Sequence, residues 1–352
     1  MTSAAFVSLF CHRTSLGRFS LTAFAFLAAT SDLAQADGIR VPTDYEPYAL
    51  AQITPEIRYP AAQQPPGTVN RHGEIEYLAD NVFGIHWYVE ANEAVWHFVT
   101  AGDPQDEVIL FIHGHPDTWW SWHEVMAYLA DDFYVIAVDT LGYGQSDKRL
   151  ELDLTYSAVA TGVGALMSEI GVETFNVVGH DRGAIIGDHM VSQDDINPRI
   201  LAYLRMQQSA DKPHGLPRPD HEGMTDVSFH TNPNLIRDLY ESNYFSVEMS
   251  EDHIARATWE YGFEGTAEAA AVRYSDASFD RELEHRLAEV FPRMTMPVVF
   301  MQGADDPGQR PEEYWQTADM VPNGEVLIVD ANHFIQAERP DIVAEAAREL
   351  FE

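Results

Sequence analysis

The residues best suited to covalent chemistry stand in the run Asn-Val-Val-Gly-His-Asp-Arg-Gly at positions 176–183. An apolar strand leads here into a turn bounded by Gly179 and Gly183, and a helix follows. This pattern projects the side chain at the turn above a sheet, at the positive end of the helix. That side chain belongs to Asp181. An Asp at such a place can also cap a helix, but the preceding strand favours a nucleophile.

A carboxylate nucleophile predicts a particular class of substrate. When a carboxylate attacks a saturated carbon it forms an alkyl ester, whose carbonyl carbon water can then attack. A serine would instead form an ether, which water does not readily cleave. Asp181 therefore points to carbon–halogen bonds or epoxides as substrates, with water as the second reactant.

The base predicted to activate that water is His333, which follows a strand in the run Val-Asp-Ala-Asn-His-Phe. A carboxylate is needed to orient its imidazole and to stabilise the imidazolium. The run Met-Gln-Gly-Ala-Asp-Asp-Pro at 301–307 offers two, of which the spacing favours Asp306 over Asp305. Asp211, one strand earlier, is a further option.

A second motif, Phe-Ile-His-Gly-His-Pro at 111–116, follows the strand predicted at the sheet centre. It resembles the HGxP motif of epoxide hydrolases and hydrolytic dehalogenases. The resemblance implies an oxyanion hole made by the backbone N–H groups of His115 and Arg182. His113 and His115 could instead form a metal pair, but no acidic or histidine partner stands at ligand spacing. No metal or cofactor is therefore predicted.

The motifs occur in the order nucleophile, acid, base, and Leu-Gly-Tyr-Gly-Gln-Ser follows at 141–146. As a set they make the chain, from about residue 75 to the C-terminus, resemble the epoxide hydrolase and dehalogenase branch of the α/β-hydrolase fold. The resemblance implies an α/β fold with a mostly parallel eight-stranded sheet, helices on both faces and an inserted helical cap. The chain departs from that family at Asn332, where glycine is usual.

The residue after the nucleophile bears on the choice of substrate. Most relatives have Trp there, whereas Arg182 resembles the fluoroacetate dehalogenase group, in which this Arg binds the substrate carboxylate. A second Arg of that group is replaced by Ile185, so the clamp is incomplete. Hydrolytic dehalogenation is ranked first, epoxide hydrolysis to a diol close behind, and a non-catalytic ligand-binding scaffold third.

Aromatic residues are the candidates for contact with the substrate or leaving group. In epoxide hydrolases two cap tyrosines donate to the epoxide oxygen, and in dehalogenases a cap residue stabilises the halide. The tyrosines available are Tyr240, Tyr244, Tyr261 and Tyr274. Of these Tyr274 and Tyr240 are singled out, together with Trp120 from the core as a pocket wall. Packing within the cap is the alternative role for each.

The elements that must position these residues are short β-rich runs alternating with helical patterns, typical of a parallel sheet covered on both faces. The run Val108–Ile112 is apolar without alternation, which predicts a strand buried on both sides. Strands are predicted at 85–90, 95–100, 108–112, 134–139, 174–178, 200–205, 298–302 and 326–329. Helices are predicted at 120–130, 156–169, directly after Asp181, 311–320 and 341–350.

The remaining segments define the domain organisation. Residues 74–206 and 294–352 are assigned to the α/β-hydrolase core, and 207–293 to the cap. Residues 37–73 are rich in proline and form an extended arm. Residues 1–36 are typical of a signal peptide, with basic residues before an apolar stretch and cleavage after Ala36. The sole cysteine, Cys11, falls in that segment. The expectation is a periplasmic or secreted protein without a stable membrane anchor.

Charge limits the possible partners. The chain has 56 Asp and Glu residues against 21 Lys and Arg residues, for a net charge of -35. Such a surface repels the phosphate backbone of nucleic acid. The partners expected are a small-molecule substrate and water, and nothing in the sequence fixes the oligomeric state.

Overall fold

The computed structural model describes residues 58–208, 222–276, 278–314 and 320–352. The predicted signal peptide, Cys11, the first part of the arm and Asp211 lie outside these residues. In the part described, no helix is both long and apolar enough to cross a bilayer.

The core is a sheet of nine strands within the described ranges, in the order β1-β2-β3-β5-β4-β6-β7-β8-β9. The strands are β1 (Ile75–Tyr77), β2 (Phe83–Ala91), β3 (Ala94–Ala101), β4 (Val108–Ile112), β5 (Tyr134–Val138), β6 (Phe175–His180), β7 (Ile200–Met206), β8 (Val298–Gly303) and β9 (Gly324–Val329). From β5 to β9 neighbouring strands are parallel, while β1, β2 and β3 form an antiparallel edge. The sheet is mostly parallel, as predicted.

The prediction of eight strands was wrong by one, since β1 was not foreseen. Its three residues, Ile-Glu-Tyr, are too few to display an alternating pattern. This strand exists because β2 supplies hydrogen-bonding partners, with Ile75 opposite Ile85. Short edge strands of this kind depend on tertiary pairing and are not visible in local sequence.

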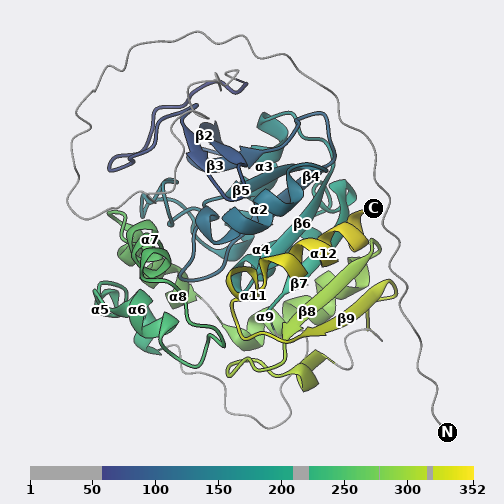
Figure 1. Ribbon diagram of the computed structural model, residues 1–352. Helices are drawn as coiled ribbons and strands as arrows, with labels where there is room; N and C mark the ends of the chain where they lie inside the picture. The colour runs from purple at the N-terminus through teal and green to yellow at the C-terminus, as the bar shows by residue number, and fades with distance from the viewer. Residues whose placement is uncertain (1–57, 209–221, 277, 315–319) are drawn as a thin grey trace, which may run out of the picture. The chain divides into compact units, whose positions relative to one another are not determined.

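Helices cover both faces of the sheet (Figure 1). α3 (Tyr156–Glu169) and α4 (Arg182–Val191) pack on one face, and α2 (His123–Leu129) and α12 (Pro340–Phe351) on the other. β5 shows why both faces need cover, because Ile136 belongs to one hydrophobic cluster and its neighbour Ala137 to the other. All five of its residues are buried, as expected for a strand covered on both sides.

The predicted helices correspond to these elements with local differences. α3 has the predicted bounds, and Thr155 caps it by accepting from the Ala158 N–H at 3.3 Å. The helix predicted at 120–130 begins instead as the 3-10 turn η1 (Trp119–Trp122) before α2. Of the helix predicted at 311–320, the structure describes the turn η6 (Pro311–Tyr314), and 315–319 lie outside the described residues.

Between β7 and β8 the chain forms a separate helical layer, drawn in green in Figure 1. Its elements are η3 (Glu222–Thr225), α5 (Val227–His230), α6 (Leu235–Tyr240), α7 (Glu251–Tyr261) and α8 (Thr266–Asp276). The chain then returns to β8 through α9 (Phe279–His285), η4 (Arg286–Val290) and η5 (Phe291–Arg293), where Val290 and Phe291 pack in the same core cluster as Ile185 of α4. A third hydrophobic cluster joins Ile236 and Ile254 of this layer to Tyr143 and Phe334, which follow β5 and β9. The layer therefore covers the carboxyl ends of the strands, and we call it the cap.

The described part of the arm, residues 58–73, has no helix or strand and lies along the sheet edge. The Ala62 N–H donates to the Tyr88 carbonyl at 2.9 Å. Further on, the N–H groups of Val69 and Asn70 donate to the Gln145 side chain at 2.8 and 3.0 Å. Backbone groups that no regular element satisfies thus find partners on the core.

Candidate active site

Asp181 occupies a strained turn between β6 and α4, with φ 49° and ψ -115°. Two glycines make this turn sterically possible. A Cβ on Gly183 would lie 2.1 Å from the Ile112 carbonyl oxygen, and one on Gly179 would lie 2.9 Å from the Gly183 oxygen. A non-glycine residue held at such angles costs about 1–3 kcal/mol and is found chiefly at functional sites. The strand therefore ends by presenting the Asp181 carboxylate at its tip.

The loop after β4 brings a donor to this carboxylate. The backbone N–H of His115 lies 3.1 Å from Oδ1 of Asp181. Gly114 permits the approach, because a Cβ there would lie 2.6 Å from the Asp181 Cβ. The peptide bond between His115 and Pro116 is cis. Arg182, the second predicted donor, is the first residue of α4, where backbone N–H groups lack carbonyl partners within the helix.

His333 lies between two carboxylates. Its Nε2 is 3.7 Å from Oδ2 of Asp181, and its Nδ1 is 2.8 Å from Oδ2 of Asp306. Asp306 is held in turn, since its Oδ1 accepts the N–H groups of Gly308 at 2.7 Å and Gln309 at 3.1 Å. The structure brings together the three residues singled out from the sequence.

Asp305, the alternative acid, is placed differently. It is exposed, and its backbone N–H donates to the Ala331 carbonyl at 3.2 Å. The carboxylate that faces the imidazole belongs to Asp306, while Asp211 is outside the described residues.

The electrostatics of the three groups are coupled. Burial alone would lower the pKa of His333, but Asp306 and Asp181 outweigh it and raise the pKa to about 10. Burial likewise acts to raise the pKa of Asp181, but His333 and Arg182 hold it well below its usual range. At neutral pH the site therefore contains an imidazolium between two carboxylates.

A network of buried polar side chains contacts the backbone of His333. It was not predicted from the sequence. His180 donates from Nε2 to the His333 carbonyl at 2.9 Å. The Gln336 amide lies 3.1 Å from Nδ1 of His180 and donates to Asp117 at 3.2 Å. Burial and the charge of Asp181 raise the pKa of Asp117 to about 7. His180 stands inside the first motif and Asp117 directly follows the second, which was the available signal.

Tyr274 forms a wall of the site with Arg182. The Arg182 guanidinium lies over the Tyr274 ring, 4.9 Å from its centre, and the ring of His115 packs edge-on at 5.0 Å. The pKa of Tyr274 is raised well above its usual value, because of burial, with the charge of Asp181 adding to it and Arg182 opposing it. The phenol is therefore neutral and retains its proton for donation.

A second cap tyrosine, Tyr244, lies beside the base. Its ring is 5.5 Å from that of His333, and its carbonyl accepts the His333 N–H at 3.3 Å. Burial raises its pKa, and the charges of Asp306 and Asp181 add to the effect. Tyr274 thus lies beside Arg182, next to the nucleophile, and Tyr244 lies beside the base.

The other two aromatic candidates, Tyr240 and Trp120, pack mainly against the rings of neighbouring residues. Tyr240 stacks on Phe245 at 4.3 Å and its hydroxyl lies 3.3 Å from Nε2 of His253. Trp120 stacks on His123, with ring centres 4.3 Å apart and planes 8° apart. Among the contacts that the described residues show, those of Tyr240 and Trp120 join the cap to the core.

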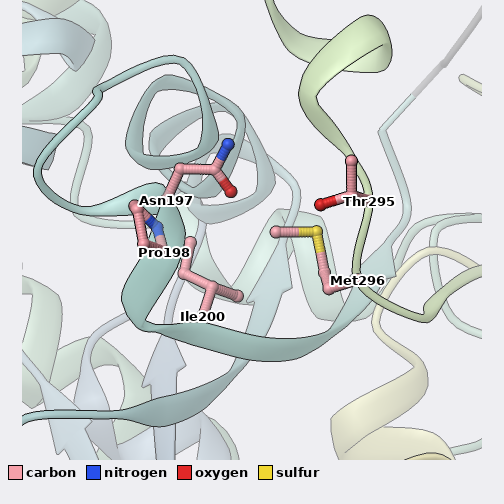
Figure 2. Close-up of a pocket in the computed structure, with 5 residues that line it drawn as sticks. All are labelled: Asn197, Pro198, Ile200, Thr295 and Met296. Carbon is pink, nitrogen blue, oxygen red and sulfur yellow. The ribbon is translucent and has the colours of Figure 1, made fainter.

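Metal-binding groups and surface hollows bear on the location of the site. Among the residues that the structure describes, no group of three or more His, Cys, Asp or Glu side chains is arranged to hold a metal. A hollow of about 330 Å³ lined by Asn197, Pro198, Ile200, Thr295 and Met296 lies at the amino ends of β7 and β8 (Figure 2). The catalytic candidates lie at the opposite, carboxyl ends, where α/β folds bind ligands.

Comparison with known proteins gives a family and several relatives. The model of the alpha/beta hydrolase fold family matches residues 107–340. The chain is 26% identical to a soluble epoxide hydrolase of Corynebacterium sp. (strain C12) over 272 residues, covering 72% of this chain and 93% of that protein. It is 21% identical to epoxide hydrolase 1 of Caenorhabditis elegans over 285 residues, covering 73% and 68% of the two chains.

Solved structures show the same fold. An epoxide hydrolase determined without ligand superposes with a TM-score of 0.63 at 24% identity, covering 76% of this chain and 98% of the other. An alpha/beta hydrolase fold protein from Burkholderia ambifaria gives a TM-score of 0.64 at 22% identity, covering 79% and 100%.

Proposed function

Because the chain belongs to the alpha/beta hydrolase fold family, we propose that it hydrolyses epoxides through a covalent ester on Asp181. Enzymes of this family act with water on small molecules, and the chain is such an enzyme. The observation that carries the finer proposal is the position of His333, whose two ring nitrogens face Asp181 and Asp306. The names of the relatives favour an epoxide over the carbon–halogen bond ranked first from the sequence.

In the first step a carboxylate oxygen of Asp181 attacks an epoxide carbon. The new carbon–oxygen bond forms as the ring carbon–oxygen bond breaks, and the leaving oxygen takes a proton from a cap tyrosine. Tyr274 and Tyr244 are suitable donors because both are kept neutral by burial. The product is a hydroxyalkyl ester of Asp181 and a tyrosinate.

Formation of the ester changes the state of His333. The imidazolium loses the charge of Asp181 as a partner, so its pKa falls and it can give its proton back to the tyrosinate. The neutral imidazole then removes a proton from water, which attacks the ester carbonyl carbon. Negative charge develops on the carbonyl oxygen, within reach of the His115 N–H. As this intermediate collapses, the ester carbon–oxygen bond breaks and the leaving oxygen takes the proton from the imidazolium, which releases the diol. The carboxylic acid left on Asp181 then gives its proton to the imidazole, so that the carboxylate and the imidazolium of the free enzyme are restored.

Hydrolytic dehalogenation is the second candidate, and Arg182 favours it. This side chain is buried and positively charged next to the nucleophile. A cation there can stabilise a substrate carboxylate or a departing halide. The same covalent ester would form, with halide rather than alkoxide as the leaving group.

A substrate panel distinguishes the two. An aryl epoxide, a haloalkane and fluoroacetate are incubated with the purified protein, and diol and halide are measured separately. The proposal expects diol from the epoxide with turnover at least tenfold above that of any halide. Halide release without diol would transfer the assignment to dehalogenation, and neither product from any substrate would contradict both.

A further inference from the structure

A line of four titratable side chains, separate from the active site, lies at the antiparallel edge of the sheet. Glu76 on β1 is 2.8 Å from Nε2 of His86 on β2, through its Oε2. Nδ1 of His86 is 2.8 Å from Nε2 of His97 on β3. Nδ1 of His97 is 2.6 Å from Oδ2 of Asp139, which follows β5. Two carboxylates are thus joined by two imidazoles in one line of hydrogen bonds.

The sheet register explains how the histidines meet. In the β2–β3 pair His86 stands opposite Val99 and His97 opposite Tyr88, so the two histidines are diagonal neighbours on one face. Their ring centres are 5.1 Å apart and their planes differ by only 20°. The rings are nearly parallel and their facing nitrogens are 2.8 Å apart, so at this separation of the ring centres the rings meet edge to edge. The contact therefore runs along the lone-pair directions of the two nitrogens.

This arrangement is dry. His86, His97 and Asp139 have no exposed surface, and the Glu76 side chain is 15% exposed. Water therefore cannot supply the hydrogen in the His86–His97 contact or in the His97–Asp139 contact. Each contact must therefore contain a hydrogen that is carried by one of these four side chains.

Counting those hydrogens gives a definite result. Two neutral imidazoles and two carboxylates carry two hydrogens between them, one on each ring. The line has three contacts, and each requires one hydrogen. With only two, one of the three contacts, at 2.6–2.8 Å, would set two lone pairs against each other with no hydrogen between them.

We propose that the His86–His97 pair is a buried proton-binding site, which holds one proton more than two neutral imidazoles and shares it between the facing nitrogens. The charge of the four groups together is then -1 rather than -2. The site lies apart from Asp181, and its existence does not depend on the reaction the enzyme performs.

The proton resides on the imidazoles rather than on the carboxylates. Burial acts to raise the pKa of Glu76, but Arg256 and His86 outweigh it and lower the pKa to about 2. Burial has the same tendency at Asp139, where His97 outweighs it and lowers the pKa. Burial lowers the pKa of His97, and the charge of Asp139 and its hydrogen bond to the ring oppose this. The free-energy cost of burying the charge is lower when two rings share the proton and two carboxylates flank them.

The charged groups around the line belong to several elements. Arg256 on α7 pairs with Glu76 at 2.6 Å and with Glu260 at 2.6 Å. Burial raises the pKa of Glu260 to about 8. Near Asp139 lie Lys148, whose pKa burial lowers to about 8, and His113, whose pKa burial lowers to about 4. Two further ionisable neighbours are Tyr88, whose ring lies 4.8 Å from that of His97, and His123, which interacts electrostatically with Arg256 and Glu76.

The site couples the cap to the core because Arg256 belongs to the cap. Its guanidinium lies between Trp120 of the core and Trp259 of the cap, 5.6 and 4.9 Å from the ring centres. Loss of the shared proton would force the histidines apart and displace Glu76, the core residue to which Arg256 is paired. Alkaline pH should therefore weaken this attachment of the cap.

Neutron diffraction from crystals of the deuterated full chain at pH 7 tests the proton count directly. The proposal expects nuclear density for deuterium in all three contacts, including the one between His86 and His97. Density in only the two outer contacts would overturn it, and so would a separation of the two rings.

Ring nitrogen-15 spectra of histidine-labelled protein provide a second test, recorded as a function of pH. Glu76→Gln removes an anion and should weaken proton binding by the pair roughly tenfold, lowering its midpoint by about one pH unit. Arg256→Met removes a cation and should raise the midpoint by a similar amount. Arg237→Met is the matched control, since Arg237 pairs only with exposed cap residues Glu241 and Glu251 in the contacts described. Midpoints that do not move in opposite directions in the first two variants contradict the proposal.

Discussion

At the scale of single residues, His333 changes its role during the proposed reaction. In the free enzyme it is an imidazolium paired with Asp181 and Asp306. Esterification removes one partner, so the same ring can serve as a base in the second step. The two half-reactions should therefore respond differently to substitution.

His333→Gln should separate the half-reactions. Attack by Asp181 needs no base, so one equivalent of ester forms, while hydrolysis falls by about 10²–10⁴-fold because general-base catalysis is lost. The mass of the intact protein after exposure to the substrate shows the adduct. The control is His285→Gln, a histidine that stacks on His189 away from the triad. Full turnover by the His333 variant would remove the ring from the mechanism.

Asp306→Asn should lower turnover by about 10²-fold or more, since Asn does not stabilise an imidazolium. The neighbouring Asp305→Asn is a close control because Asp305 is exposed and its side chain is not on the imidazole. Steady-state kinetics on both variants measure the effect. Equal losses in the two, or a loss only at Asp305, would show that the acid has been misassigned.

At the scale of elements, the turn at Asp181 depends on the absence of a side chain at Gly183. Gly183→Ala would place a methyl group 2.1 Å from the Ile112 carbonyl, and relief of that clash should cost about 3 kcal/mol. Gly223→Ala is the control, because a Cβ there meets nothing within 4 Å. Denaturant unfolding of both variants gives the comparison. A Gly183 variant as stable as the control would contradict the described turn.

The elements that can be predicted from the sequence are those whose signal lies within the element itself. The apolar run Val108–Ile112 and the capped helix starting at Tyr156 carry local signals and were confirmed with their bounds. β1 has no such signal and is defined by its partner strand. Likewise the motifs placed Asp181, His333 and Asp306, but the His180–Gln336–Asp117 network joins the end of β6, the short helix Ile335–Glu338 and the loop after β4. The contact between His86 and His97 similarly depends on strand register, which local sequence does not specify.

At the scale of the whole molecule, the coupled site makes folding stability depend on pH. The pKa of His333 rises from 6.5 to about 10 on folding. Its contribution to stability is therefore complete below pH 6.5 and is lost as the pH rises toward 10. Unfolding free energies measured between pH 6 and 10 should fall more steeply for the wild type than for His333→Gln. Parallel curves would contradict the raised pKa.

Export is a further proposal at this scale and concerns the segment before the described residues. If residues 1–36 are a signal peptide, the mature chain begins at Asp37. Expression in a bacterial host with a fractionated periplasm, followed by N-terminal sequencing, checks this. Retention of residues 1–36 in a cytoplasmic product would oppose it, and Ala36→Arg should block processing if the cleavage site is correct.

An isotope measurement distinguishes a covalent ester on Asp181 from direct attack of water on the substrate. A single turnover in water enriched in oxygen-18, with enzyme in excess over an aryl epoxide, should place the label in the Asp181 carboxylate, because water attacks the ester carbonyl. Peptide mass spectrometry locates it. Label found only in the diol, with the Asp181 peptide unchanged, would mean that water attacks the substrate itself and would contradict the account.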